Sequence, residues 1–183
     1  MERENLWAPW RIEYIQGLSK EPHTSEDKNA GAGEKSDCFI CHNLKHPEGD
    51  DENLVLWRTQ ESIVILNRFP YNNGHMLIAP NRHIPDLTDA TQEELLGMIK
   101  LIRESQKALS LAIKPHGFNV GMNFSRCAGA GLPGHLHIHV VPRWDGDTNF
   151  MAVCSGVDVI SQSLTELLAL LKEISKEHNL PGL

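Results

Sequence analysis

The sequence lacks a long hydrophobic run, an excess of positive charge and a dense set of cysteines. No apolar stretch approaches the roughly 20 residues of a membrane-spanning helix. No apolar segment follows the charged start Met1–Glu4 either, so we expect neither a membrane partner nor a secretory signal. The formal net charge of -7 offers no attraction to long nucleic acid. The 4 cysteines are too few for a disulfide scaffold, and we expect a cytoplasmic protein.

The chain length suits one domain with an N-terminal extension. The 183 residues are 40% hydrophobic and 22% charged, which is an ordinary globular balance. Residues 1–18 mix aromatic and polar side chains, which indicates an arm that packs on the domain or on a partner subunit. Residues 19–37 are polar and cannot offset the entropy of ordering. We predict an arm and a flexible loop over 1–37 and one domain over 38–183.

Short apolar runs predict the strands of a sheet. They cover residues 54–58, 62–66, 75–79, 118–124, 135–141 and 150–154. The links between several of these runs have hairpin length. A mainly antiparallel sheet in an α+β fold is therefore expected.

Two amphipathic helices are predicted beside this sheet. Thr91 and Glu94 fit a capping box, and residues 114–117 contain stop signals. Between them, apolar residues recur at helical spacing: Leu95, Ile99, Ile102 and Leu109. Ser163 and Glu166 fit a second capping box, before a leucine-rich segment. The first segment predicts a central helix and the second a C-terminal helix.

The most informative segment is 135–141, which reads His-Leu-His-Ile-His-Val-Val. Side chains alternate between the two faces of a strand. His135, His137 and His139 therefore share one face, and the apolar residues between them point into the core. Packing alone does not explain three titratable rings on one face. We interpret the segment as part of a functional site.

Two kinds of chemistry fit these histidines. An H-x-H pair is able to hold a metal ion, as in a zinc hydrolase. All three rings do not easily share one ion, because His135 and His139 lie about 13 Å apart at strand rise. Alternatively, a neutral imidazole attacks phosphorus and forms a phosphoramidate, while a neighbouring histidine moves protons.

The residues before the histidines favour the second interpretation. Asn123, Ser125 and Arg126 lead into a glycine-rich stretch over 129–134. Such a loop exposes backbone N–H groups that form a nest for an anion. A phosphate held there would lie beside the start of the histidine strand.

The pair Cys38 and Cys41 has the C-x-x-C spacing of half a zinc site. The spacing alone also fits a redox pair or chance. The other two cysteines, Cys127 and Cys154, are expected to be small core residues or loop thiols.

These motifs together resemble the histidine triad (HIT) family. The segment 135–141, followed by Pro-Arg-Trp, resembles the signature of the family, and residues 66–80 resemble its nucleotide-binding hairpin. The resemblance covers about 54–154. Residues 6–15 and the ending Val-Val-Pro-Arg-Trp resemble one branch, the diadenosine tetraphosphate (Ap4A) phosphorylases, also called ATP adenylyltransferases. A HIT-like fold is then implied for the domain.

The resemblance also implies roles for particular residues. His137 would be the nucleophile that attacks the α-phosphate, and His139 and His75 would frame that phosphate. The implied ligand contacts are ribose at Asn67, adenine at Leu66 and Phe69, and phosphate at Asn123, Ser125, Gly129, Ala130 and Gly131. A structural zinc ion is implied at Cys38, Cys41, His83 and His135, with His42 and His46 as rivals for the fourth ligand. The family also implies a homodimer.

Several functions remain open at this point. The expected reaction transfers AMP from a dinucleoside polyphosphate through an AMP-histidine intermediate, so that Ap4A and phosphate give ADP and ATP. A hydrolase acting on Ap4A or on an AMP phosphoramidate would use water instead of phosphate. A zinc hydrolase with an H-x-H site and a non-catalytic nucleotide-binding protein are further alternatives. We expect an adenine nucleotide, although the residues by themselves do not separate adenine from guanine.

Overall fold

A computed structural model describes residues 38–147 and 160–182. The N-terminal arm and loop over 1–37 and the strand expected over 150–154 lie outside the described residues. None of the helices in the described ranges is both long and apolar enough to cross a membrane.

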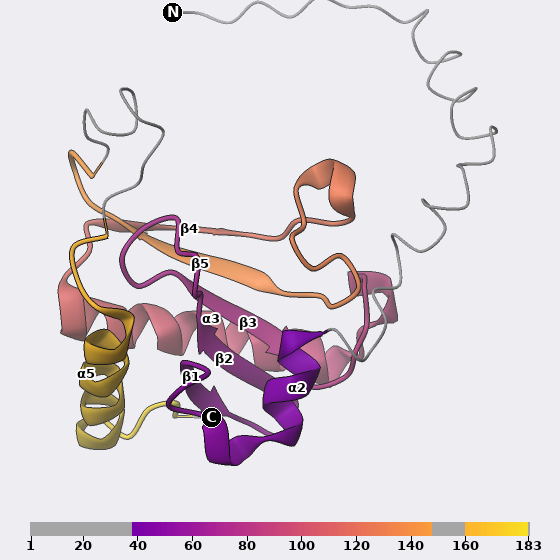
Figure 1. Cartoon of the computed structure of the whole chain (residues 1–183), viewed down its shortest axis with the longest axis horizontal. Helices are drawn as coiled ribbons and strands as arrows, with labels where there is room; N and C mark the ends of the chain where they lie inside the picture. The colour runs from indigo at the N-terminus through magenta and orange to yellow at the C-terminus, as the bar shows by residue number, and fades with distance from the viewer. Residues whose placement is uncertain (1–37, 148–159, 183) are drawn as a thin grey trace, which may run out of the picture.

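A five-stranded antiparallel sheet forms the centre of the domain (Figure 1). Its order is β1-β2-β3-β5-β4, and every neighbouring pair is antiparallel. The strands are β1 Val55–Arg58, β2 Ser62–Leu66, β3 Met76–Pro80, β4 Gly117–Gly121 and β5 Ile138–Arg143. The predicted fold class is confirmed. The edge strands of the sheet are β1 and β4, and β4 pairs with β5.

Three α-helices in the described ranges surround the sheet. They are α2 Phe39–Lys45, α3 Gln92–Ile113 and α5 Leu164–Glu177. Short 3-10 turns lie between the elements: η1 Pro47–Gly49 before β1, η2 Leu87–Asp89 before α3 and η3 Arg126–Ala128 between β4 and β5. Figure 1 shows α3 behind the strands and α2 in front of them. The α5 helix packs on α3 and β1, where Trp57 Nε1 donates to Ser175 Oγ at 3.0 Å.

The central helix begins as the sequence predicts, but its apolar side is wider than expected. The capping box of Thr91 and Glu94 is complete in both directions. Met98, Leu101 and Leu109 are buried. Ile99, which has the helical spacing of a core residue, is instead 58% exposed. This helix therefore has apolar side chains on a second, outward face.

The second predicted capping box does not form. The side chain of Ser163 caps no backbone N–H of α5, because its Oγ lies 2.8 Å from Thr165 Oγ1. Leu167, Leu168 and Leu171 are nevertheless buried, so packing rather than the cap holds the helix. The helix is predicted correctly, but its cap is not.

The sheet separates the core from a second face that carries the histidines. Leu77 lies opposite both Ile65 and His139 in the ladder, so these three side chains share one face. The alternate residues Ile78 and Ile138 pack on the other face, which α3 covers. Regular pairing of β5 starts at Ile138 rather than at residue 135 as predicted.

Candidate active site and metal centre

The three histidines of the strand segment divide between two sites. The apolar residues Leu136, Ile138 and Val140 are buried as predicted. The N–H of Leu136 donates to the carbonyl of Ile84 at 2.6 Å, outside the sheet, so the chain leaves the ladder before β5 begins. This departure turns His135 towards Cys38 and Cys41, away from the two later histidines.

His137 is oriented by the backbone of its own segment. Its Nδ1 lies 2.8 Å from the carbonyl oxygen of His135, and because a carbonyl only accepts, Nδ1 carries a proton and donates. The lone pair of the neutral imidazole then belongs to Nε2. The residue is only 7% exposed, which limits its rotation. A neutral imidazole held in this way is able to act as a nucleophile.

The protonation of His75 follows from its fixed neighbours. The backbone N–H of Tyr71 donates to His75 Nδ1 at 3.1 Å, so Nδ1 accepts. Asn67 Oδ1 accepts the N–H of Phe69 at 3.0 Å, which leaves Asn67 Nδ2 to donate to His75 Nδ1 at 3.2 Å. The proton of neutral His75 is therefore on Nε2.

His139 accepts a hydrogen bond from His75 at Nδ1 and carries a proton of its own on Nε2. His75 Nε2 lies 2.9 Å from His139 Nδ1. Because Nδ1 accepts, the proton of neutral His139 is on Nε2. This Nε2 is buried and has no hydrogen-bond partner within the described ranges. A buried N–H without a partner is costly, so the geometry favours an acceptor oxygen of a ligand at this point.

Burial keeps both of these rings neutral near pH 7. Desolvation, and after it the charges of His139 and His137, lowers the pKa of His75 to about 3. Desolvation, and after it His137, lowers the pKa of His139 to about 4. The ring of Tyr71 packs over both, with centroid distances of 4.7 Å to His75 and 5.7 Å to His139. Hydrogen-bond donation by a neutral ring, rather than by an imidazolium, is the chemistry this arrangement supports.

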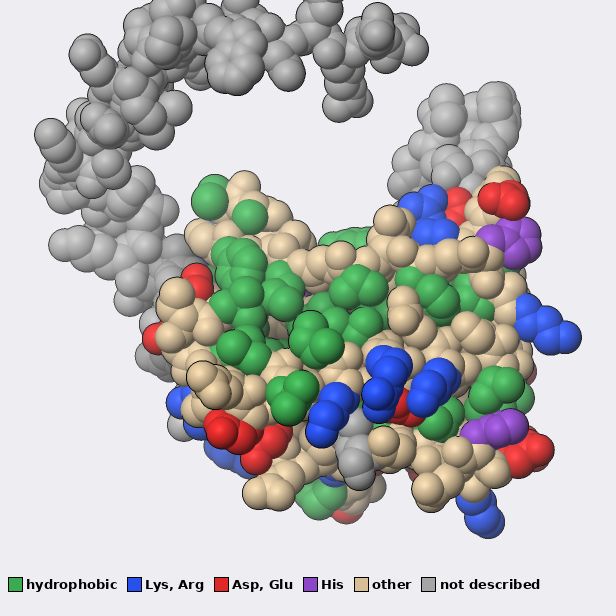
Figure 2. Space-filling model, turned by 180° about the vertical axis from the view of Figure 1, so that it is seen from behind, with side chains coloured by type: hydrophobic (Ala, Val, Ile, Leu, Met, Phe, Trp, Pro, Cys, Tyr) green, Lys and Arg blue, Asp and Glu red, His purple; other side chains and the backbone are tan. Residues whose placement is uncertain are grey.

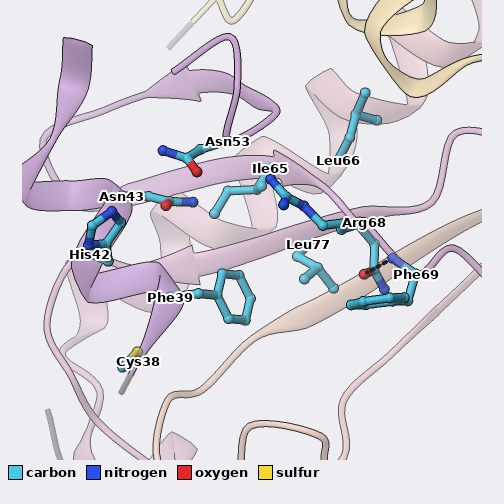
Figure 3. A pocket seen from close by; sticks show the side chains of 11 residues that line it. Cys38, Phe39, His42, Asn43, Asn53, Ile65, Leu66, Arg68, Phe69 and Leu77 are labelled. Carbon is cyan, nitrogen blue, oxygen red and sulfur yellow. Dashed lines mark hydrogen bonds between the residues drawn. The ribbon is translucent and has the colours of Figure 1, made fainter. Parts of the chain in front are cut away.

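A cavity of about 450 Å³ lies beside Asn67, between α2 and β2 (Figure 3). Phe39 and Leu77 point into the cavity, and the ring of Phe69 lies near Leu77 (Figure 3). Phe69 is 81% exposed, so it is not a core residue. These aromatic and aliphatic side chains suit a flat apolar group such as a nucleobase.

The side chain of Leu66, which was expected to contact adenine, does not point into this cavity. It is among the lining residues, but its side chain points away from the cavity (Figure 3). The ladder explains the direction, because Leu66 pairs with Met76 and both are buried on the core side. The neighbouring Ile65 supplies the aliphatic surface on the cavity side.

Sequence reasoning missed most of the cavity wall. Phe39, His42 and Asn43 come from α2, a helix of seven residues. Such a short helix leaves too little periodicity for a prediction. Asn53 comes from a loop without a motif, whereas Arg68 lies in the segment 66–80 that resembles the nucleotide-binding hairpin, although the resemblance implies no role for it. The C-x-x-C pair is the one nearby signal, because it marks the first turn of α2.

The glycine-rich loop folds partly on itself. The N–H groups of Ala128 and Ala130 both donate to the carbonyl of Ser125, at 3.3 and 3.2 Å. Ser125 has φ 67 and ψ 165, a region that glycine mainly adopts. Ala130 is buried, whereas Ser125 is exposed. These donors are therefore turned inward rather than into an open nest.

The remaining predicted phosphate contacts lie around the same turn. Asn123 Nδ2 is 3.4 Å from the carbonyl of Gly129, which links the start of the loop to its end. Gly129 has φ 89, and Gly131 is exposed. Figure 1 shows the loop projecting beyond the ends of β4 and β5.

The candidate metal centre joins four residues that are distant in sequence. The ligand atoms of Cys38, Cys41, His83 and His135 all lie within 4.8 Å of one another. Cys38 Sγ is 3.2 Å from His135 Nδ1, and Cys41 Sγ is 3.2 Å from His83 Nδ1. His135 Nε2 donates to the carbonyl of Pro80 at 2.8 Å, so its Nδ1 lone pair faces the thiols. A Cys₂His₂ set of this kind fits a tetrahedral zinc ion.

The two rival histidines lie outside this cluster. His42 and His46 pack on each other with ring centroids 4.5 Å apart. His46 Nδ1 is also 2.9 Å from Glu48 Oε1. Neither belongs to the group of side chains whose ligand atoms converge.

Solved structures share this fold. The structure of a Zn-bound histidine triad family protein from Mycobacterium smegmatis matches with a TM-score of 0.64 and 25% identity, over 80% of this chain and 98% of that chain. The diadenosine triphosphate hydrolase of Plasmodium falciparum matches with a TM-score of 0.57 and 21% identity, over 69% of this chain and 78% of that one. The sheet and the paired histidines thus define a histidine triad fold.

Sequence comparison agrees with the structural match. The model of the HIT domain matches residues 48–146. The AP-4-A phosphorylase of Mycobacterium tuberculosis (strain H37Rv) is 35% identical over 168 residues, 92% of this chain and 82% of the relative. The asymmetrical bis(5'-nucleosyl)-tetraphosphatase of Schizosaccharomyces pombe is 32% identical over 56% of this chain and 54% of the relative. The chain belongs to the HIT domain family.

Proposed function

We propose that this protein is a nucleotidyl transferase that converts Ap4A and inorganic phosphate into ADP and ATP. The observation that carries the proposal is the fixed orientation of His137, whose Nδ1–H is held by the His135 carbonyl so that Nε2 is the nucleophile. The similarity to a relative named AP-4-A phosphorylase over 92% of this chain supports the choice of substrate.

The reaction proceeds in two displacements. In the first, His137 Nε2 attacks the α-phosphorus of Ap4A, a P–N bond forms, and the P–O bond to the departing ATP breaks. In the second, an oxygen of inorganic phosphate attacks the same phosphorus, the P–N bond breaks, and ADP leaves. His139 donates its Nε2–H to a phosphate oxygen, and His75 maintains that tautomer.

The nucleoside binds with its base in the cavity and its ribose at Asn67. Phe39, Phe69 and Leu77 enclose the base, and Leu66 contributes backbone to the same wall. Asn67 joins this subsite to the histidines, because its amide also contacts His75. The loop contacts the polyphosphate through Asn123, Ser125 and Gly131, because the N–H groups of Gly129 and Ala130 already donate to carbonyls within the loop.

A hydrolase is the second candidate. It shares the first displacement, and water replaces phosphate in the second. The similarity to the S. pombe tetraphosphatase favours it. A zinc hydrolase with an H-x-H site fits less well, because His137 Nδ1 is engaged by a carbonyl and His139 Nδ1 by His75.

The Cys₂His₂ cluster holds a structural zinc ion in this proposal. The Zn-bound neighbour from M. smegmatis supports the choice of metal. Bound to all four side chains, the ion would have a closed tetrahedral shell and would cross-link α2 to the segment before β5. It positions the base cavity and the start of the histidine segment and takes no part in the displacements.

We further propose that two copies of the chain associate. Figure 2 shows hydrophobic side chains gathered on the α3 side of the molecule. Leu96, Ile99 and Leu111 of α3 and Val120 of β4 are exposed apolar residues. The β4 strand is the last strand in the sheet order, and no strand within residues 38–147 or 160–182 pairs with its outer edge, which would suit pairing with a second copy.

Product analysis tests the reaction directly. Purified protein is incubated with Ap4A, with and without inorganic phosphate, and products are separated by ion exchange. ADP and ATP formed only with phosphate support the transferase. AMP and ATP formed without phosphate would make the protein a hydrolase, and intact Ap4A in both samples would contradict both.

A further inference from the structure

One polar side chain in the cavity wall makes no hydrogen bond to another described residue. Asn43 is 4% exposed and lines the cavity. Its backbone carbonyl accepts from Arg58 Nη2 at 2.6 Å and from the N–H of His46 at 3.2 Å. Its side-chain amide makes no hydrogen bond with any residue that the structure describes.

The amide points into the space that a base would fill. In Figure 3 it extends from α2 towards Ile65 on the opposite wall. The apolar part of the cavity wall comes from Phe39, Ile65 and Leu77, together with Leu66 and Phe69. An aliphatic side chain at position 43 would continue this surface, whereas the unpaired amide of Asn43 faces the cavity, where a bound base would bury it. The polar side chain of Asn43 in this apolar wall therefore points to a ligand that carries its own hydrogen-bond donor and acceptor.

From this geometry we infer that Asn43 selects the nucleobase by pairing with the 6-amino group and an adjacent ring nitrogen of adenine. A carboxamide offers one acceptor, Oδ1, next to one donor, Nδ2. Adenine presents a complementary amino donor and ring acceptor side by side, and asparagine pairs with them through two hydrogen bonds. A purine without the amino group leaves Oδ1 buried and unpaired.

The inference rests on the proposed function, because it needs a nucleotide with its base in this cavity and its α-phosphate at His137. The cavity and the histidines are connected through Asn67, which lines the one and donates to His75 in the other. A base held by Asn43 therefore belongs to the same nucleoside whose phosphate reacts.

The other carboxamide of the cavity provides a matched control. Asn53 also lines the wall but is only half-buried. Its Nδ2 is packed against Gly49, where an added Cβ would lie 2.9 Å away. We assign base selection to Asn43 and not to Asn53.

The test compares Ap4A with the corresponding tetraphosphate of purine riboside, which lacks the 6-amino group. In the wild-type protein, kcat/KM should fall about 10- to 100-fold when the amino group is removed. In Asn43→Leu the two substrates should differ by less than about threefold, because no group remains to pair with the amine. In Asn53→Leu the wild-type ratio should persist.

Calorimetry with AMP and purine riboside 5'-monophosphate separates this inference from the proposed reaction. If the wild-type protein binds AMP at least about tenfold more tightly but does not turn over Ap4A, base selection stands and the proposed function fails. Equal binding of the two monophosphates overturns base selection, whatever the turnover. Loss of the preference in Asn53→Leu instead of Asn43→Leu overturns it as well. Asn43→Ala repeats the test if Asn43→Leu does not fold.

Discussion

His135 and His137 are separated by one residue and have opposite chemical orientations. His135 donates from Nε2 to the carbonyl of Pro80 and turns Nδ1 towards two thiols. His137 donates from Nδ1 to the carbonyl of His135 and leaves Nε2 for chemistry. The residue type is the same, and the carbonyl that each ring meets decides which nitrogen is presented.

The two ends of the histidine segment also differ in the side chains that surround them. The end at His135 joins Cys38, Cys41 and His83 in a closed set of ligands. The end at His139 joins His75, and its Nε2–H is directed at no described residue. In our proposal, the first end stabilises the fold by holding zinc, and the second end binds the substrate. The predictions below test this separation.

The largest effect is expected for His137→Ala. Removing the nucleophile should lower turnover of Ap4A by at least about 1,000-fold. The metal content should not change, because His137 is not among the clustered ligands. Steady-state kinetics and zinc analysis measure the two quantities. Substantial turnover by the variant would contradict covalent catalysis.

Cys38→Ser should change the metal content, which His137→Ala should leave unchanged, and should also lower the stability of the protein. This thiol is buried and lies within the ligand cluster, so the variant should lose zinc and about 3 kcal/mol or more of unfolding free energy. Urea denaturation and metal analysis give the result. Cys127→Ser serves as the control, since Cys127 is exposed and outside the cluster. Unchanged stability and zinc content in Cys38→Ser would contradict a structural metal.

The pH dependence of stability should report the burial of His75. Its pKa is about 3 in the folded protein, against an ordinary value of 6.5. The unfolded chain therefore binds more protons between these values, and stability falls as the pH is lowered through 6.5. This one group should cost about 2 kcal/mol between pH 7 and pH 5.

Urea denaturation at pH 7, 6 and 5 measures this loss. His75→Leu should have a correspondingly shallower pH dependence than the wild type. Paired carboxylates do not explain a loss above pH 5, since Arg82 holds the pKa of Glu94 below its usual range. Identical slopes in the variant and the wild type would show that His75 is not buried in its neutral form.

The sequence predicts regular features of this molecule better than exceptions to them. The alternation at Leu136 and Ile138 correctly separates core from site, because it depends only on the period of a strand. It does not predict that Leu136 bonds to Ile84, which is what turns His135 towards the cysteines. Cys38 and His135, two of the proposed metal ligands, are 97 residues apart, and only the family resemblance suggested that they meet.

The two capping boxes and the base cavity show the same limit. Thr91 and Ser163 begin the same four-residue pattern, but the hydroxyl of Ser163 pairs with Thr165 instead of the backbone. A local pattern cannot anticipate such a competitor. Asn43 is an ordinary residue in the sequence, and the position of its unpaired amide in the cavity wall is visible only when α2 is seen against β2.

The smallest expected effect is a change in kcat when Asn67 is replaced, because Asn67 orients the ring of His75 at the His139 end of the segment. Asn67→Asp replaces an N–H donor by an acceptor at His75 Nδ1 and competes with the N–H of Tyr71, so it favours the wrong tautomer. His139 Nε2 would then lose its proton more readily, and kcat should fall about tenfold. Asn67→Ala removes only one of two donors, because the Tyr71 N–H remains. It should raise KM through the lost ribose contact and change kcat less than Asn67→Asp does. Equal kcat values in the two variants would mean that the substrate, rather than Asn67 and His75, determines the tautomer of His139.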